Sequence, residues 1–282
     1  FKTGLGNPFI KNFSKKEVKK DLKVFDISQN KNGEMYFANP GYLLEYDGFS
    51  FKNYFVKDQS DLRAVLYEDD DHIYSAGIGG FGFWSKNKKG ILEYSSLYFK
   101  YPNKQAPLLP VFLNIVSAKG TIFFQSFQQI YTYNPKNNDL NNISAIKGFS
   151  KLFSSNNRVF VQDVSIGLFE IIDSNKTFIK GSENISFDII GVFEDNTHGL
   201  LLATKNNGFW NLKNGVLQKK SWQINEEIQK SIITDVKKYQ KNRLIIGSLR
   251  NGFYIISKEG RIQAHFNRDN GIANNAIRKL FV

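Results

Sequence analysis

The chain contains no cysteine, a single methionine and only six prolines among its 282 residues. The absence of cysteine excludes a disulfide scaffold, a thiolate metal site and a cysteine nucleophile. No apolar run approaches the roughly 18 residues that a membrane-spanning helix needs. Because the single methionine is Met35, Phe1 is not a natural translation start. We therefore expect either a removed signal peptide or a piece of a longer protein.

Acidic residues are few relative to basic ones, and the formal net charge is +12. A basic chain invites a nucleic-acid interpretation, but nucleic-acid binding needs basic residues gathered on one face or stripe. Lysines here are spread along the whole sequence, and the densest run is only Lys15-Lys16 with Lys19-Lys20. We therefore expect no nucleic-acid partner. A hydrophobic content of 41% with 23% charged residues also excludes a disordered chain.

Aromatic residues make up 15% of the chain, and many stand in short alternating runs. Strands favour aromatic and β-branched residues because these fit a pleated, half-buried surface. Long stretches with helical periodicity are absent, and only Asn225 to Lys230 predicts a helical turn or two. The predicted fold class is therefore all-β.

The strand pattern repeats along the chain. Strands of one kind start at residues 35, 73, 122, 159, 200 and 244. Each is preceded by a strand containing one residue of the apolar column Ile27, Val65, Phe112, Leu152, Ile190 and Val236. Five are followed by a glycine and a further strand, at Gly41, Gly80, Gly167, Gly208 and Gly252, whereas the third repeat has Gln129. A fourth, weaker strand ends most of the repeats. Four strands in about 40 to 45 residues are typical of a β-propeller blade.

The repeat predicts a single β-propeller of seven blades with four strands each, the seventh truncated. The predicted blades cover 22–58, 62–99, 108–143, 147–182, 186–222 and 231–268, and the seventh starts at 274–282. Residues 8–13 are predicted to form the outer closing strand of blade seven, because Phe9 to Phe13 reads like Phe51 to Phe55. Such closure removes an open sheet edge.

Two segments carry a family resemblance: Leu43-Leu44-Glu45-Tyr46-Asp47-Gly48, and the opening Gly6-Asn7-Pro8-Phe9-Ile10. The chain resembles two-component-regulator propeller repeats, and in particular the N-terminal propeller of Bacteroidetes periplasmic sensors. The resemblance implies the ectodomain of an inner-membrane protein that forms a homodimer. It also implies that a second propeller, an immunoglobulin-like domain, a membrane helix and an output domain follow, the output being a histidine kinase or a LuxR-type helix-turn-helix.

The function that this resemblance implies is ligand sensing. The chain would be the periplasmic input propeller of a transmembrane signal-transduction and transcription regulator, with an oligosaccharide or another small ligand. It would not be an enzyme itself, since any kinase activity would lie in a cytoplasmic domain, and it would need no cofactor. Two alternatives remain open: a generic protein-interaction propeller, and a glycan-active enzyme of the sialidase or lyase class.

The candidate ligand-binding residues lie in connections that a propeller places on one face. These run from the outer strand to the next inner strand and from the second strand to the third, and we call that side the loop face. Two connections are long, Tyr98 to Pro110 and Trp222 to Ser231. Tyrosine beside lysine suits stacking on a sugar and hydrogen bonding to it, although these loops would equally suit covering a neighbouring domain. The candidates are Tyr98, Tyr101, Lys205, Asn207, Trp222 and Arg250.

No catalytic residue and no metal site are predicted. His72 and His198 occupy equivalent turns of different repeats, so they would be spread around a ring instead of converging on a metal. The acidic turn Glu68 to Asp71 lacks the spacing of a calcium loop. Trp84 and Trp210 fall in columns that are apolar in other repeats, which indicates core positions. The glycine-rich stretch Gly77 to Gly82 leads into a strand and not into the helix that a phosphate loop requires.

Overall fold

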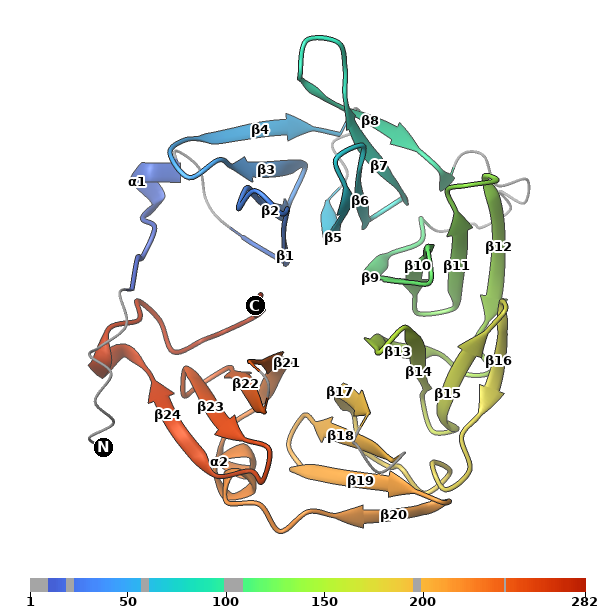
Figure 1. Cartoon of the computed structure of the whole chain (residues 1–282), viewed down its shortest axis with the longest axis vertical. Helices are drawn as coiled ribbons and strands as arrows, with labels where there is room; N and C mark the ends of the chain where they lie inside the picture. The colour runs from blue at the N-terminus through green and yellow to red at the C-terminus, as the bar shows by residue number, and fades with distance from the viewer. Residues whose placement is uncertain (1–9, 19–22, 57–60, 99–108, 195–198, 241) are drawn as a thin grey trace.

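The computed structural model describes residues 10–18, 23–56, 61–98, 109–194, 199–240 and 242–282. In these residues, strands β1 to β24 form six antiparallel four-stranded sheets arranged around a central axis (Figure 1). Within every sheet the strands pair in chain order, from the innermost strand at the axis to the outermost strand at the rim. The all-β class and the four-stranded blades are as predicted.

The strand bounds follow the repeat. Blade one holds β1 (Asp26–Gln29), β2 (Met35–Asn39), β3 (Tyr42–Tyr46) and β4 (Phe51–Phe55); blade two holds β5 (Leu62–Asp69), β6 (His72–Gly77), β7 (Gly80–Lys86) and β8 (Leu92–Ser96); blade three holds β9 (Phe112–Ala118), β10 (Thr121–Ser126), β11 (Gln129–Asn134) and β12 (Asp139–Ser144). Blade four holds β13 (Phe149–Ser155), β14 (Arg158–Asp163), β15 (Gly167–Ile172) and β16 (Asn175–Phe178); blade five holds β17 (Ile189–Glu194), β18 (Leu200–Thr204), β19 (Phe209–Lys213) and β20 (Val216–Lys219); blade six holds β21 (Ile233–Tyr239), β22 (Arg243–Ser248), β23 (Phe253–Ser257) and β24 (Ile262–Phe266).

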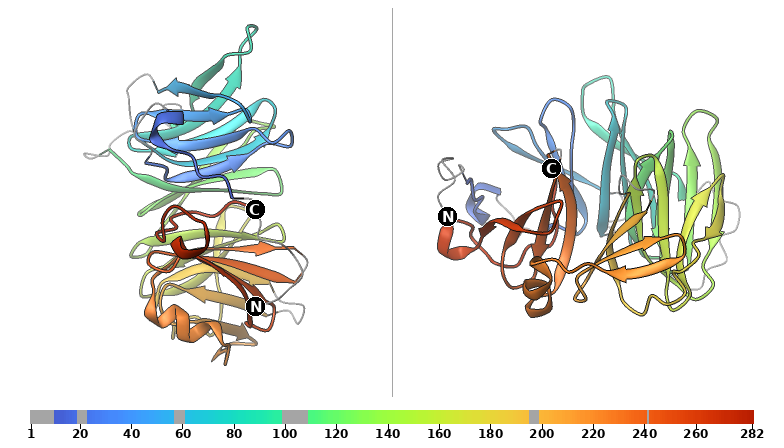
Figure 2. Two further views of the ribbon diagram at one scale, coloured as in Figure 1. Left: turned by 90° about the vertical axis from the view of Figure 1, so that its left-hand side faces the viewer. Right: turned by 60° about the horizontal axis from the view of Figure 1, so that its bottom comes forward.

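Three short helices complete the described elements: α1 (Lys15–Val18), α2 (Ile224–Lys230) and the 3-10 helix η2 (Arg268–Asn270). Helix α2 matches the predicted helical turns at Asn225 to Lys230. Seen from the side, the strands run across the thickness of the ring, so the connections gather on its two faces (Figure 2).

Four of the five glycines in the repeat column adopt the positive φ that their turn requires. At Gly252 φ is +70°, and a Cβ atom there would lie 1.9 Å from the carbonyl oxygen of Phe266. Gly80 is the exception, since the positive φ in that turn belongs to Gly79. Gln129 replaces the glycine in blade three, where its backbone N–H donates to the Ser126 hydroxyl.

Consecutive blades pack through apolar and aromatic side chains. Between blades two and three, the ring of Phe81 stacks on Phe124 with centroids 4.2 Å apart and meets Phe112 edge-on at 4.9 Å. Between blades one and two, Trp84 is buried and its indole Nε1–H donates to the Ser75 hydroxyl at 2.8 Å. The prediction that Trp84 belongs to the core is confirmed. Trp210 is half-buried, with its ring 5.1 Å from Phe187.

The prediction of seven blades with a truncated seventh is wrong. The described residues form six blades, and neither residues 10–13 nor residues 274–282 form a strand. Residues 8 and 9 of the predicted closing strand lie outside the described residues. The physical reason is that a strand exists through a ladder of backbone hydrogen bonds with a neighbouring strand. Among the described residues, no further strand is available to form such a ladder with residues 274–282.

The arc between blades six and one is instead filled by residues 10–18 and 271–282, which we call the closing arc (Figure 1). The ring of Phe13 meets Tyr46 of β3 edge-on at 5.0 Å and Phe51 of β4 at 5.5 Å. The side-chain amide of Asn12 donates to the carbonyl of Gly271 at 3.1 Å. The C-terminal segment after Gly271 runs from the rim toward the axis, between β1 and β21 (Figure 1).

Candidate functional site

The topology places the five described candidates among the sequence-predicted residues on the loop face, as their connections require. Lys205 and Asn207 lie in the turn between β18 and β19, and Arg250 lies in the turn between β22 and β23. Tyr98 follows β8 and Trp222 follows β20, while Tyr101 lies outside the described residues. Lys205, Asn207, Trp222 and Arg250 thus belong to the neighbouring blades five and six. Tyr98 belongs to blade two, on another part of the ring (Figure 1).

The two described aromatic candidates pack against other side chains. The ring of Tyr98 lies 5.6 Å from Phe81 and 5.9 Å from Tyr131, centroid to centroid. The indole of Trp222 lies 4.8 Å from Phe209, and a Cβ atom on Gly260 would come within 2.1 Å of its Cγ. Both side chains are half-buried. They anchor their connections to the blades, which leaves them little free ring surface for a sugar.

The polar candidates of blades five and six are more accessible. The ammonium of Lys205 lies 3.1 Å from the Asp188 carboxylate, and both side chains are about half exposed. The side-chain amide of Asn207 donates to Asn206 at 3.4 Å. Arg250 is exposed and makes no hydrogen bond or ion pair with another residue in the described part of the chain. These groups can offer hydrogen bonds to a ligand on the loop face.

Blades three and four present apolar side chains on the same face. The carbonyl of Phe127 accepts from the Phe149 N–H, and the carbonyl of Gly148 accepts from the Val164 N–H, which brings these turns together. The residues of this apolar loop patch are between 38% and 72% exposed: Leu109, Val111, Leu113, Phe127, Ile146 and Val164. Several exposed apolar side chains on neighbouring connections of one face are typical of a surface that another protein covers.

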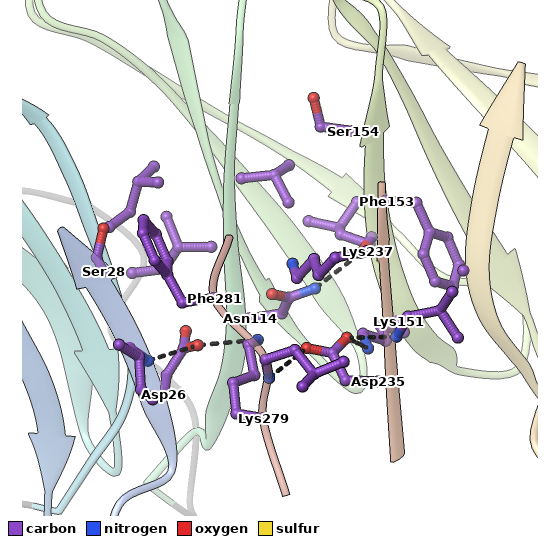
Figure 3. Close-up of a pocket in the computed structure, with 18 of the residues that line it drawn as sticks. Asp26, Ser28, Asn114, Lys151, Phe153, Ser154, Asp235, Lys237, Lys279 and Phe281 are labelled. Carbon is purple, nitrogen blue, oxygen red and sulfur yellow. Dashed lines mark hydrogen bonds and ion pairs between the residues drawn. The ribbon is translucent and has the colours of Figure 1, made fainter. Parts of the chain in front are cut away.

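A central channel of about 350 Å³ runs along the axis (Figure 3). Every innermost strand, from β1 to β21, contributes to its wall, and so do residues 279–281 of the closing arc. The pairing registers place Asp26, Ala64, Asn114, Gly191 and Asp235 at one level of their blades. Lys151 lies beside this polar level, in the register shift between Phe149 and Leu152.

The next inward-facing position along each strand forms a second, largely apolar level. Because side chains alternate along a strand, residues two positions further on face the same side. This level comprises Ser28, Leu66, Val116, Phe153, Phe193, Lys237 and Phe281. The channel therefore combines a charged level with an apolar wall that contains one lysine.

The charges of the polar level are paired across the closing arc. The ammonium of Lys279 lies 2.8 Å from Asp26 Oδ1, and the backbone N–H of Leu280 donates to Asp235 Oδ2 at 3.1 Å. Asp26 Oδ2 accepts the Val65 N–H at 3.2 Å. The backbone N–H of Leu280 thus donates to Asp235 in the same way as the backbone N–H of Val65 donates to Asp26. The closing arc occupies the place of a further inner strand without being part of a sheet.

Burial shifts the protonation equilibria of these groups. Desolvation lowers the pKa of Lys151 to about 8, although the Asp235 carboxylate 3.4 Å away favours its charged form. Burial works against the charged forms of Asp235 and Lys279 as well. For Asp235 the positive charges of Lys151, Lys237 and Lys279 outweigh burial, and the pKa is lowered. For Lys279 the carboxylates of Asp26 and Asp235 outweigh burial, and the pKa is raised.

The channel residues were not predicted from the sequence, although the repeat contains a signal for them. Asp26, Lys151 and Asp235 each directly precede a member of the apolar first-strand column, namely Ile27, Leu152 and Val236. A charged residue at a fixed place before the same column in three repeats indicates convergence on the axis. Lys279 could not be recognised in this way, because its partner Asp26 lies at the other end of the chain.

The histidines, for which no metal site was predicted, lie apart. His72 lies 2.9 Å from Asp69 and stacks on Tyr74, whereas His265 stacks on Tyr254 at 4.2 Å. His198 lies outside the described residues. Within the residues that the structure describes, no three histidine, cysteine or acidic side chains gather as a metal site would need. None of the described helices is long and apolar enough to cross a membrane.

Solved structures share this fold. The extracellular domain of a hybrid two-component system of B. thetaiotaomicron matches 96% of the chain with a TM-score of 0.68 and 14% identity. That of a one-component system from the same organism matches 92% with a TM-score of 0.66 and 17% identity. Virginiamycin B lyase from Staphylococcus aureus matches 85% with a TM-score of 0.62 and 12% identity. No protein-family model and no curated protein sequence matches the chain.

At these identities the likeness shows the propeller fold. The chain spans 39% and 35% of the two extracellular domains, and it spans 83% of the lyase. The neighbours thus include extracellular domains of the regulators that the sequence resembles. They also include an enzyme, so the fold alone does not separate a sensor from a catalyst.

Proposed function

We propose that this chain is a ligand-sensing input propeller in the periplasmic ectodomain of a transmembrane regulator. The observation that carries the proposal is the fold likeness to two regulator ectodomains over more than nine tenths of the chain. The repeat sequence around Leu43 to Gly48 points the same way. A rigid ring that presents loops on one face suits recognition, because loops bind while the scaffold holds them in place.

The ligand would bind to the loop face of blades five and six, where Lys205, Asn207 and Arg250 offer polar groups beside Trp222. An oligosaccharide suits this surface because its hydroxyls accept and donate hydrogen bonds. Sensing requires no chemistry in the propeller. The ligand would favour one arrangement of a dimeric ectodomain, and this bias would pass through the membrane to an output domain. Adjacent domains of the same protein would supply the membrane helix and the output.

The test measures binding of a glycan panel to the full chain by array and then by calorimetry. Arg250→Ala and Asn207→Ala should each weaken the best glycan about tenfold, the value of one hydrogen bond to a charged or polar partner. Lys31→Ala, in the turn between β1 and β2 on the opposite face, should leave affinity unchanged. Equal affinity in all three variants would remove the loop face as the site. Cleavage of a glycan would replace sensing with the enzyme alternative.

A second candidate function rests on the apolar loop patch of blades three and four. Such a patch favours a docked protein surface, and we propose as its occupant a neighbouring domain of the same chain. The regulator ectodomains with this fold are more than twice as long as this chain, which gives room for one. In the whole ectodomain, Phe127→Ser with Ile146→Ser should undock the neighbouring domain and raise the hydrodynamic radius in light scattering, and Val216→Ser on the opposite face should not. Unchanged scattering in both variants would oppose this function.

A further inference from the structure

Both carboxylates of the central channel already have protein partners at each of their oxygens. Asp26 accepts from the backbone N–H groups of Ile27 and Val65 and from Lys279. Asp235 accepts from the backbone of Val236 and Leu280 and from Lys151. Neither carboxylate has an oxygen left without a bond. They therefore hold the inner strands and the closing arc in place, and are not poised to capture a cation.

The lysines of the channel outnumber these carboxylates. Lys151 and Lys279 each have an acidic partner, but Lys237 makes no hydrogen bond or ion pair with any residue that the structure describes. Its side chain is half-buried and belongs to the level formed mainly by Leu66, Phe153 and Phe193. Lys237 acts on the Asp235 carboxylate only without contact. With three ammonium groups against the two carboxylates of Asp26 and Asp235, the channel has one excess positive charge, which favours an anion beside Lys237.

We propose that the channel binds a small monoanion with an apolar body, whose carboxylate pairs with Lys237. One unpaired positive charge matches one negative charge, whereas a phosphate dianion would need further donors from a wall that is apolar at this level. The body of the ligand would lie against Phe153, Phe193 and Phe281. A volume of about 350 Å³ limits the ligand to a single ring or a short branched chain. This site is separate from the loop face and does not depend on the proposed function.

The probe is 3-phenylpropionate, and its uncharged match is 3-phenylpropanamide, which has the same body. Calorimetry on the full chain at pH 7 should show binding of the carboxylate, and at least tenfold weaker binding of the amide. Lys237→Met should weaken the carboxylate about tenfold and leave the amide unchanged. Lys237→Arg should retain binding. Because Lys237 makes no hydrogen bond or contact ion pair in the described part of the chain, the methionine variant should unfold close to the temperature of the parent chain.

Lys31→Met in the exposed turn between β1 and β2 is the matched control, because Lys31 lies outside the channel lining and the loop face, and it should bind the carboxylate like the parent chain. Methyl resonances of Leu66 and Val116 should shift on addition of the carboxylate and locate the probe in the channel. Equal affinity for carboxylate and amide, no loss in Lys237→Met, or no binding up to about 10 mM would each overturn the proposal. A glycan that still depends on Arg250 after such a result would leave the proposed function intact.

Discussion

The interfaces between consecutive blades differ in kind from the closing arc between blades six and one. Blades two and three meet through buried rings such as Phe81, Phe112 and Phe124, all fully buried. The closing arc has Phe13, which is 37% exposed, a small cluster around Val18, and the Lys279–Asp26 ion pair. Apolar burial stabilises in proportion to area, whereas a buried ion pair loses much of its attraction to desolvation. The ring is therefore held mainly by its blade interfaces and is weakest at its closure.

The largest expected effect is at a blade interface. Phe81→Ala removes a ring that packs on four aromatic neighbours, and should lower the free energy of unfolding by about 4 kcal/mol. Urea denaturation measures it. Phe49→Ala is the matched control, because Phe49 is 98% exposed and should change the same quantity by less than about 0.5 kcal/mol. If Phe81→Ala lowered the free energy of unfolding by less than the closing-arc variants do, the blade interface would not be the stronger of the two regions.

A smaller loss is expected when the ion pair of the closing arc is broken. Lys279→Met leaves the buried carboxylate of Asp26 without its cation, and should lower the free energy of unfolding by about 2 to 3 kcal/mol. Lys31→Met removes the exposed pair with Asp70 on the surface and should change it by less than about 1 kcal/mol. If both variants lowered the free energy of unfolding equally, the Lys279–Asp26 pair at the axis would contribute no more than the exposed Lys31–Asp70 pair.

The aromatic contacts of the N-terminal segment should contribute less again. Phe13→Ala removes edge contacts with Tyr46 and Phe51, and we expect a loss of about 1 kcal/mol because the ring is partly exposed. The double variant with Lys279→Met, measured by the same denaturation, reports whether the two halves of the closing arc act together. A double-variant loss equal to the sum of the single losses would show that they close the ring independently.

The smallest expected difference is in the acid dependence of stability. Since the pKa of Asp235 is lower in the folded protein than in the unfolded chain, its contribution is complete above the ordinary aspartate pKa of about 3.9 and is lost as pH falls through the folded value. Asp235→Asn should therefore lose less stability than the parent chain between about pH 5 and pH 2. Parallel acid titrations of unfolding would show that Asp235 does not contribute to the acid sensitivity of the closure.

The blades could be predicted from sequence because their information is local. Each strand pairs with its neighbour across a turn of a few residues, so the hairpin of Met35 to Asn39 with Tyr42 to Tyr46 can be predicted from that short stretch alone. Blade three lacks the column glycine, yet its hairpin forms through the Ser126 hydroxyl. Its outer strand, Asp139–Ser144, is too polar for the apolar pattern to reveal.

The candidate site was harder to predict because it depends on convergence. The loop-face residues could be chosen from connection length, but the burial of Tyr98 and Trp222 depends on rings from other strands, Phe81 and Phe209. The length of a connection does not indicate which of its side chains are buried. The channel lysines needed the whole ring, since their neighbours come from every blade.

The sequence by itself determined the all-β class, the four-stranded blade and the order of strands within it, because all three follow from short-range alternation and turns. Only the tertiary structure decided how many blades form and how the ring is closed. Lys279 and Asp26 are separated by nearly the whole chain, and no local pattern links them. Residues 274–282 carry a strand-like sequence, but a strand needs a partner, and the folded ring offers this segment side-chain and single backbone contacts in place of a sheet.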